Sequence, residues 1–108
     1  YESQVIVHCS ICGNYRFERM RIWRSTFLYP HESPHRSKLL HCENIAIFPF
    51  WTDIKLGKTS TFTLIFSGLP KECEVFDLIE QATEPYAFEY RNIQRNKTDI
   101  YFIDFNKL

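Results

Sequence analysis

The sequence predicts an all-β protein, a sandwich or a barrel, on three observations. Phe, Tyr and Trp make up 17% of the residues, and these side chains favour β-strands. Apolar and polar residues alternate from Thr59 to Ser67, so that Phe62, Leu64 and Phe66 fall on one side. Short apolar segments are separated by turn residues at the spacing typical of sandwiches and barrels. We therefore expect Phe62, Leu64 and Phe66 to face the core. Thr61 and Thr63 are expected to face away from it.

Seven segments have the composition and alternation of strands. In chain order they are 4–11, 17–26, 38–45, 59–67, 74–80, 87–93 and 100–105. A helix is the alternative for the second segment, because Phe17, Met20, Trp23 and Phe27 fall near helical spacing, and a short helical turn is the alternative for residues 72–81. No N-cap residue precedes the second segment and its aromatic content favours a strand, so we expect a strand there.

Turn residues and prolines predict the connections between these strands. The last two strands are expected to form a hairpin around residues 95–97, and the segment Tyr29 to Ser37, with two prolines, is expected to be a surface loop. No linker, repeat or low-complexity segment divides the 108 residues, which predicts a single domain over residues 1–108. Because the chain opens on Tyr1 and shows no signal-peptide leader, we expect it to be part of a longer protein.

Composition and motifs argue against catalysis. The 13 Lys and Arg residues balance the 13 Asp and Glu residues, so the overall charge favours neither an anionic nor a cationic partner. Only three glycines are present, and the sequence contains no P-loop, Gly-x-Ser-x-Gly or His-Glu-x-x-His motif. No apolar run approaches the length of a membrane span. We expect a domain that is not an enzyme, binds no cofactor and does not cross a membrane.

The most specific chemical signal is the motif Cys-Ser-Ile-Cys-Gly at residues 9–13. Cys-x-x-Cys-Gly is half of a zinc site in many zinc ribbons, because its turn brings two thiolates to one metal. The other half is missing, since the two remaining cysteines are each isolated in the sequence. In one extended strand, residues three apart point to opposite faces and cannot share a metal. We expect Cys9 to point inward and Cys12 outward; a small zinc-binding module anchored by both is the alternative.

A second candidate site combines arginine with aromatic residues. Four arginines interleave with two aromatic residues in and just before the second predicted strand: Arg16, Arg19, Arg21, Arg24, Phe17 and Trp23. Such strands can bind single-stranded nucleic acid, with guanidinium groups on phosphates and rings on bases. Because the chain is neutral and lacks an RNA-recognition signature, we expect an exposed sheet face or edge instead. A nucleic-acid or carbohydrate binder that uses this surface is the alternative.

The segment Phe-Pro-Phe-Trp at residues 48–51 is the third candidate for binding. Four bulky residues around a proline cannot alternate in and out of a sheet, so they either cover the end of the core or form an exposed apolar patch. We expect them to cover the core, because soluble domains rarely leave such patches exposed. The alternative is an interaction surface formed by Phe48, Phe50, Trp51, Arg19, Arg21 and Trp23.

The stretch Thr61 to Glu80 resembles a known pattern. Its sequence is Thr-Phe-Thr-Leu-Ile-Phe-Ser-Gly-Leu-Pro-Lys-Glu-Cys-Glu-Val-Phe-Asp-Leu-Ile-Glu. Uncharacterised β-sandwich domains of gut-dwelling anaerobic bacteria have a similar Phe-x-Leu-x-Phe strand, followed by Leu-Pro-Lys and then by Phe-Asp-Leu-Ile-Glu. Residues 21–28 and 39–45 fall where that family has further strands. The motif at residues 9–13 is not part of the family's pattern.

The resemblance implies an antiparallel β-sandwich of immunoglobulin-like architecture. Domains of that family occur in exported or envelope proteins, sometimes beside a thioredoxin-like domain, and the resemblance supplies no catalytic residues. We therefore expect a non-catalytic accessory or interaction domain of a larger exported bacterial protein. Its expected partner is an unidentified protein or a neighbouring domain of the parent chain. The expected compartment is the periplasm, the cell envelope or the extracellular space.

Overall fold

The computed structural model describes residues 4–14, 18–83 and 87–107, and over these residues the chain is all-β, as the sequence predicts. The strands are β1 (Val5–Cys12), β2 (Arg19–Met20), β3 (Thr26–Pro30), β4 (Ser37–Glu43), β5 (Thr52–Asp53), β6 (Thr59–Phe66), β7 (Val75–Glu80), β8 (Glu89–Gln94) and β9 (Ile100–Asp104). A short 3₁₀ helix, η1 (Phe105–Lys107), follows β9. Among the described residues, no helix has the length and apolar character that crossing a membrane requires.

Seven strands form one mixed sheet in the order β8-β7-β3-β4-β6-β1-β9, and β2 pairs with β5 in a separate two-stranded ribbon. Every pairing between these nine strands is antiparallel except that of β1 with β9, which is parallel. The expectation of a purely antiparallel arrangement is therefore wrong at this pair. The predicted hairpin is also wrong, because β8 and β9 lie at opposite ends of the strand order.

The connection between β8 and β9 explains why no hairpin forms. Arg95 donates two N–H groups to the Asp99 carboxylate, each at 3.0 Å, and others to the backbone carbonyls of Pro70 and Cys73. The bonds to Pro70 and Cys73 tie the connection to the loop between β6 and β7. The backbone carbonyl of Asp99 then accepts the N–H of Ile6 at 2.9 Å, which starts the parallel pairing of β9 with β1.

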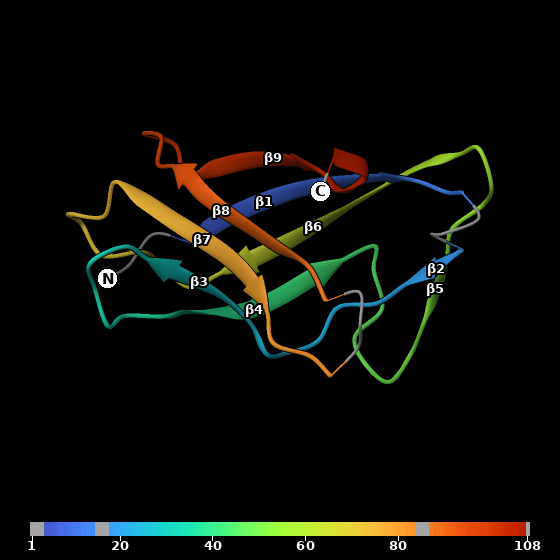
Figure 1. The fold of residues 1–108 in the computed structure, drawn as a ribbon, viewed down its shortest axis with the longest axis horizontal. Helices are drawn as coiled ribbons and strands as arrows, with labels where there is room; N and C mark the ends of the chain where they lie inside the picture. Colours follow the sequence, from blue (N-terminus) through green and yellow to red (C-terminus); the bar gives the residue numbers. More distant parts are fainter. Residues whose placement is uncertain (1–3, 15–17, 84–86, 108) are drawn as a thin grey trace.

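The sheet curls so that its two halves face each other. In Figure 1, β7 and β8 cross in front of β1 and β6, and β8 and β9 diverge from the turn that joins them. Phe76 of β7 contacts Tyr101 of β9 at a ring-centroid distance of 5.1 Å. At the C-terminal end of β9, the hydroxyl of Tyr90 in β8 donates to the backbone carbonyl of Asp104 at 3.2 Å. One curled sheet thus encloses the core.

Alternation correctly predicted the inner sides of β6 and β1. Phe62, Leu64 and Phe66 are at most 3% exposed, whereas Thr61 is exposed and Thr63 is half-buried. The inner side of β1 is buried in the same way, with no member more than 2% exposed: Val5, Val7, Cys9 and Ile11. The two strands pair directly, so their inner side chains form one continuous apolar surface.

The strand predicted over 17–26 is wrong in its extent, and its first residue lies outside the described residues. β2 ends at Met20 and β3 begins only at Thr26. Between them, the backbone N–H of Trp23 binds the Glu80 carboxylate at 3.0 Å, and the Thr26 hydroxyl donates to the Trp23 carbonyl at 2.7 Å. Side chains thus take the backbone groups that a sheet ladder would use, and the chain turns. Because β3 then continues through Pro30, the predicted loop shortens to residues 31–36.

Candidate interaction surface

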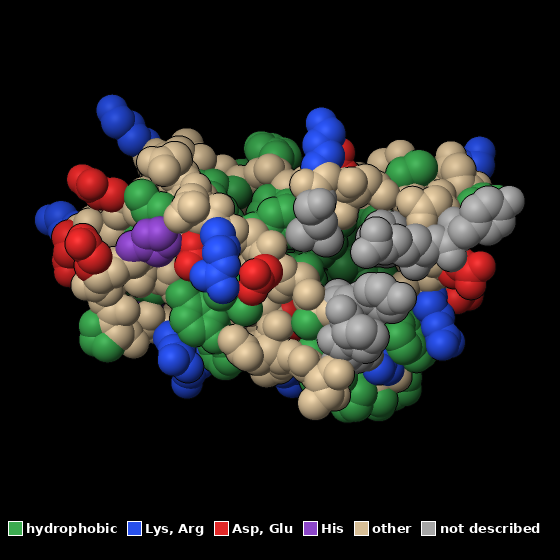
Figure 2. All heavy atoms as spheres, viewed as in Figure 1, with side chains coloured by type: hydrophobic (Ala, Val, Ile, Leu, Met, Phe, Trp, Pro, Cys, Tyr) green, Lys and Arg blue, Asp and Glu red, His purple; other side chains and the backbone are tan. Residues whose placement is uncertain are grey.

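The structure brings together the six residues that the sequence singled out for interaction. The Arg–aromatic surface consists of Arg19, Arg21, Trp23, Phe48, Phe50 and Trp51. It lies at the end of the molecule that carries the β2–β5 ribbon (Figure 1). Figure 2 shows hydrophobic side chains gathered around the connection between β4 and β5 at this end, with Lys or Arg side chains beside them.

Two sets of backbone contacts position the surface. The N–H of Ile22 donates to the carbonyl of Ala46, and the carbonyl of Ile22 accepts the N–H of Phe48, both at 2.9 Å. In the antiparallel ribbon, Arg19 pairs with Asp53 and Met20 with Thr52, which places the chain just before β5 beside the chain just after β2. Ile22 is fully buried, so the side chains of Arg21 and Trp23 on either side of it point outward, toward residues 48–51. Arginine and aromatic side chains from two distant segments therefore meet.

Stacking organises the side chains of the surface. The guanidinium carbon of Arg21 lies 3.8 Å from the centroid of the Trp51 ring and 4.6 Å from that of Phe48. Arg19 lies over the same Trp51 ring at 4.3 Å. Trp23 stacks on Phe48 with centroids 4.0 Å apart and an interplanar angle of 26°. Each cation–π contact contributes about 0.5–1 kcal/mol at an exposed site, and the stacked pair about as much again.

The expectation that residues 48–51 cover the core is wrong. Phe48, Phe50 and Trp51 are 42%, 72% and 41% exposed. The inward positions at this end are already filled by Ile22 and Ile54, which are at most 5% exposed. Because no room remains beneath them, the three aromatic side chains lie on the outside. They form the alternative that the sequence left open, an exposed apolar patch beside two arginines.

The cysteine motif does not assemble a pair of thiols. Cys9 is 2% exposed on the inner side of β1, and Cys12 is half-buried on the opposite side. The glycine of the motif has a packing role, because a Cβ at Gly13 would collide with the carbonyl oxygen of Lys55. Within the ranges that the structure describes, no group of three or more His, Cys, Asp or Glu side chains is placed to hold a metal ion.

Burial also makes the inner thiols poor nucleophiles. It raises the pKa of Cys9 to about 12, to which the nearby Cys42 contributes, and the pKa of Cys42 to about 11. A thiol with a pKa of about 12 is roughly 0.01% thiolate at pH 8. We therefore expect a thiol reagent at pH 8 to modify Cys12 in the native protein and Cys9 only after unfolding in urea. Peptide mapping of the labelled protein would measure this order.

Metal analysis provides the complementary control for the cysteines. The purified domain is expected to carry no stoichiometric zinc, and a chelator is expected to leave its melting temperature unchanged. One zinc per chain, lost in both Cys9→Ser and Cys12→Ser, would contradict the strand geometry, because a shared metal requires both sulfurs on one side. Equal protection of the two thiols in the native state would contradict it as well.

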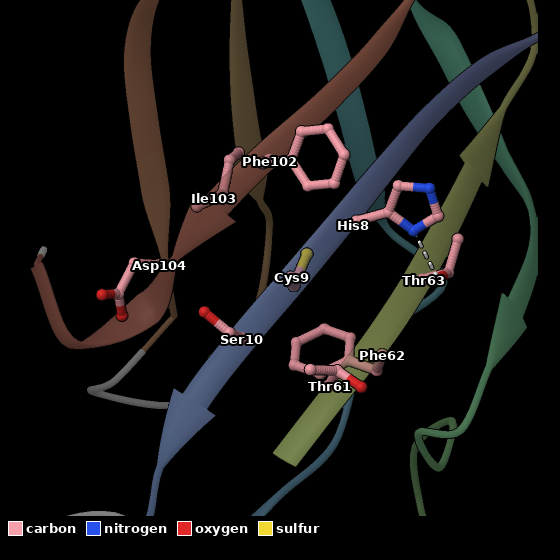
Figure 3. A pocket seen from close by; sticks show the side chains of 9 residues that line it. All are labelled: His8, Cys9, Ser10, Thr61, Phe62, Thr63, Phe102, Ile103 and Asp104. Carbon is pink, nitrogen blue, oxygen red and sulfur yellow. Dashed lines mark hydrogen bonds between the residues drawn. The ribbon is translucent and has the colours of Figure 1, made fainter. Parts of the chain in front are cut away.

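An open groove of about 460 Å³ lies over the outer face of β6, β1 and β9 (Figure 3). His8 occupies its middle: Nδ1 is 3.0 Å from the Thr63 hydroxyl, and the ring stacks on Phe102 with centroids 5.2 Å apart. Phe102 is 80% exposed. The sequence does not predict this groove, because the groove depends on the parallel pairing of β1 with β9. The only sign in the sequence is the alternation within each strand, which shows the outer side of a strand but not which strand lies next to it.

The groove contains a serine, a histidine and an aspartate, but not in a catalytic arrangement. Ser10 pairs with Asp104, and this pair lies two residues along the strands from the pair of His8 with Phe102. Two residues along a strand separate side chains by about 6.6 Å. In the described part of the chain, no hydrogen bond joins His8 to either of them. The Asp104 carboxylate instead accepts the backbone N–H of Asn106 at 2.9 Å. A nucleophile and its base need hydrogen-bond contact, which this geometry does not supply.

Comparisons with protein-family models, with curated proteins and with solved structures find no match to this chain. The class that the fold and the site define is an all-β domain with an exposed surface of stacked arginine and aromatic side chains.

Proposed function

We propose that this domain is a non-catalytic interaction module and that the Arg–aromatic surface is its binding region. The observation that carries the proposal is the exposure of Phe48, Phe50 and Trp51, each more than 40% accessible, beside two stacked guanidinium groups. Aromatic and arginine side chains are enriched at the centres of protein interfaces and supply most of their binding energy. An exposed apolar patch next to charged groups is typical of such an interface.

Preorganisation supports the same proposal. Arg21 is held by ring contacts and by a hydrogen bond from its Nη1 to the Pro49 carbonyl at 3.1 Å. Trp23 is held by its stack on Phe48. Its indole Nε1 is buried without a hydrogen-bond partner among the described residues, so stacking fixes this ring. Side chains that are already ordered lose little conformational entropy on association, which favours affinity.

The module is proposed to be an immunoglobulin-like accessory domain of a larger exported bacterial protein, in the periplasm, the envelope or outside the cell. The support is the resemblance of residues 61–80 to such domains, together with the all-β class. Its partner is then a second protein or a neighbouring domain of the parent chain. Either partner would cover the same aromatic side chains, because they are the large apolar groups gathered at this end.

Site-specific photo-cross-linking in the cells that carry the native gene tests the proposal. A benzophenone side chain replaces Phe50, and the matched control carries it in place of Phe102, which is at least as exposed but lies in the groove. We expect a discrete cross-linked peptide from position 50, identified by mass spectrometry, and none from position 102. The product should disappear when Trp51→Ala is added. No product at position 50, or an equal yield at both positions, would refute the proposal.

A further inference from the structure

We infer that the partner presents an acidic segment of polypeptide, with carboxylates for Arg19 and Arg21 and an apolar side chain for Phe50. This inference rests on the proposed function and specifies the chemistry of the partner. Three features of the Arg–aromatic surface support it: covered ring faces, guanidinium groups that present their edges, and a local excess of positive charge.

The rings of Trp51, Phe48 and Trp23 are already in contact with other side chains of the surface. Both arginines lie over Trp51, and Phe48 is in contact with Trp23 as well as with Arg21. A sugar ring or a nucleic-acid base binds such residues by stacking on a bare ring face. To stack on Trp51, Phe48 or Trp23, either ligand would have to displace a guanidinium group or break the Trp23–Phe48 stack, which leaves only the single ring of Phe50. The arrangement therefore disfavours the carbohydrate and nucleic-acid alternatives for this surface.

Stacked guanidinium groups present their hydrogen-bond donors sideways. All five N–H donors of an arginine lie in the plane of the group, so a ring beneath it leaves them at the rim. Arg19 is exposed, and no hydrogen bond or ion pair of its side chain occurs within the described residues, not even to Asp53 opposite it. A carboxylate accepts two such donors side by side. The stacked geometry thus favours a planar anionic group that approaches from the edge.

The local charge has the sign that such a partner requires. The segments 18–24 and 47–58, which build this end, carry five basic side chains and two acidic ones, and Glu80 at the Trp23 N–H adds a third acidic one, although the whole chain is neutral. The basic residues are Arg19, Arg21, Arg24, Lys55 and Lys58. This excess attracts an acidic segment during approach and repels a basic one.

The spacing of the two arginines matches an extended acidic segment. Arg19 and Arg21 are two residues apart in an extended stretch, which separates them by about 6.6 Å along the chain. Alternate carboxylates of an extended partner segment repeat at the same distance. Phe50 projects beside them at 72% exposure and needs an apolar cover when the surface is bound. A segment of alternating Asp or Glu and apolar residues meets both requirements.

Titration of the ¹⁵N-labelled domain with synthetic peptides tests the inference. The probe is Asp-Phe-Asp-Leu-Asp-Phe-Asp, the control peptide has Asn in place of every Asp, and a short oligothymidine strand represents nucleic acid. We expect the acidic peptide to shift the Trp51 Nε1–H signal and the Phe50 amide, and the Asn peptide to leave them unchanged. The double variant Arg19→Gln/Arg21→Gln should weaken binding at least about tenfold.

A matched variant separates these two arginines from general positive charge. Lys55→Gln/Lys58→Gln removes the same charge at the same end without touching a stacked ring, and it should weaken binding by less than about threefold. Thermal melts of both variants verify that they are folded. Equal binding of the Asn peptide, or tighter binding of oligothymidine at Trp51, would overturn the inference. A persistent cross-link at position 50 with no response to the acidic peptide would overturn the inference and leave the proposed function standing.

Discussion

Replacing Phe62 with alanine is expected to lower the free energy of unfolding by about 3–5 kcal/mol. The ring is 3% exposed and meets Phe105 edge-to-face at a centroid distance of 5.3 Å. Removing it takes away apolar burial and leaves a cavity beside Phe105, which β1 and β4, paired on either side of β6, prevent from closing. Urea denaturation followed by circular dichroism would measure the loss as a lower transition midpoint.

Thr61→Ala is the matched control for this prediction. Thr61 precedes Phe62 on the same strand, is exposed, and contributes its backbone carbonyl, not its side chain, to the hydrogen bond from Asn44. Its removal should change the free energy of unfolding by less than about 0.5 kcal/mol. Similar losses for the two variants would mean that the inner and outer sides of β6 are assigned wrongly.

Arg95→Met is expected to cost about 3 kcal/mol of stability, because it leaves the carboxylate of Asp99 largely buried without its cation. The two side chains are 18% and 11% exposed and are joined by two N–H donors at 3.0 Å. The hydroxyl of Tyr101, whose pKa burial raises to about 12, still donates to Asp99 at 3.0 Å but brings no positive charge. Because both groups retain some solvent contact, the loss should lie at the lower end of the range for buried pairs.

A second substitution shows whether the unpaired charge causes this loss. Arg95→Met/Asp99→Asn should be more stable than Arg95→Met alone, because the buried negative charge is gone. Lys97→Met, in the same connection but exposed, should stay within about 0.5 kcal/mol of the wild type. A double variant less stable than Arg95→Met would refute the electrostatic explanation.

Local patterns were reliable wherever one strand had a clear inner side. The alternation in β6 predicted the buried side chains, and the same reasoning placed Cys9 inside β1 and Cys12 opposite it. Burial on one side of a strand leaves a period of two in the sequence, so it can be recognised without knowing the neighbouring strands. The prediction over 17–26 failed because side chains of Glu80 and Thr26 interrupt the strand, and Glu80 is distant in sequence.

The sequence by itself determined the all-β class, most of the strand positions and the inner faces of β1 and β6. Only the tertiary structure decided the strand order, the parallel pairing of β9 with β1, and the meeting of Arg19 and Arg21 with Trp51. Class and inner face follow from composition and periodicity within a few residues. Pairing partners are chosen by backbone hydrogen bonds and packing between distant segments, such as Ile22 with Ala46, and no local pattern carries that information.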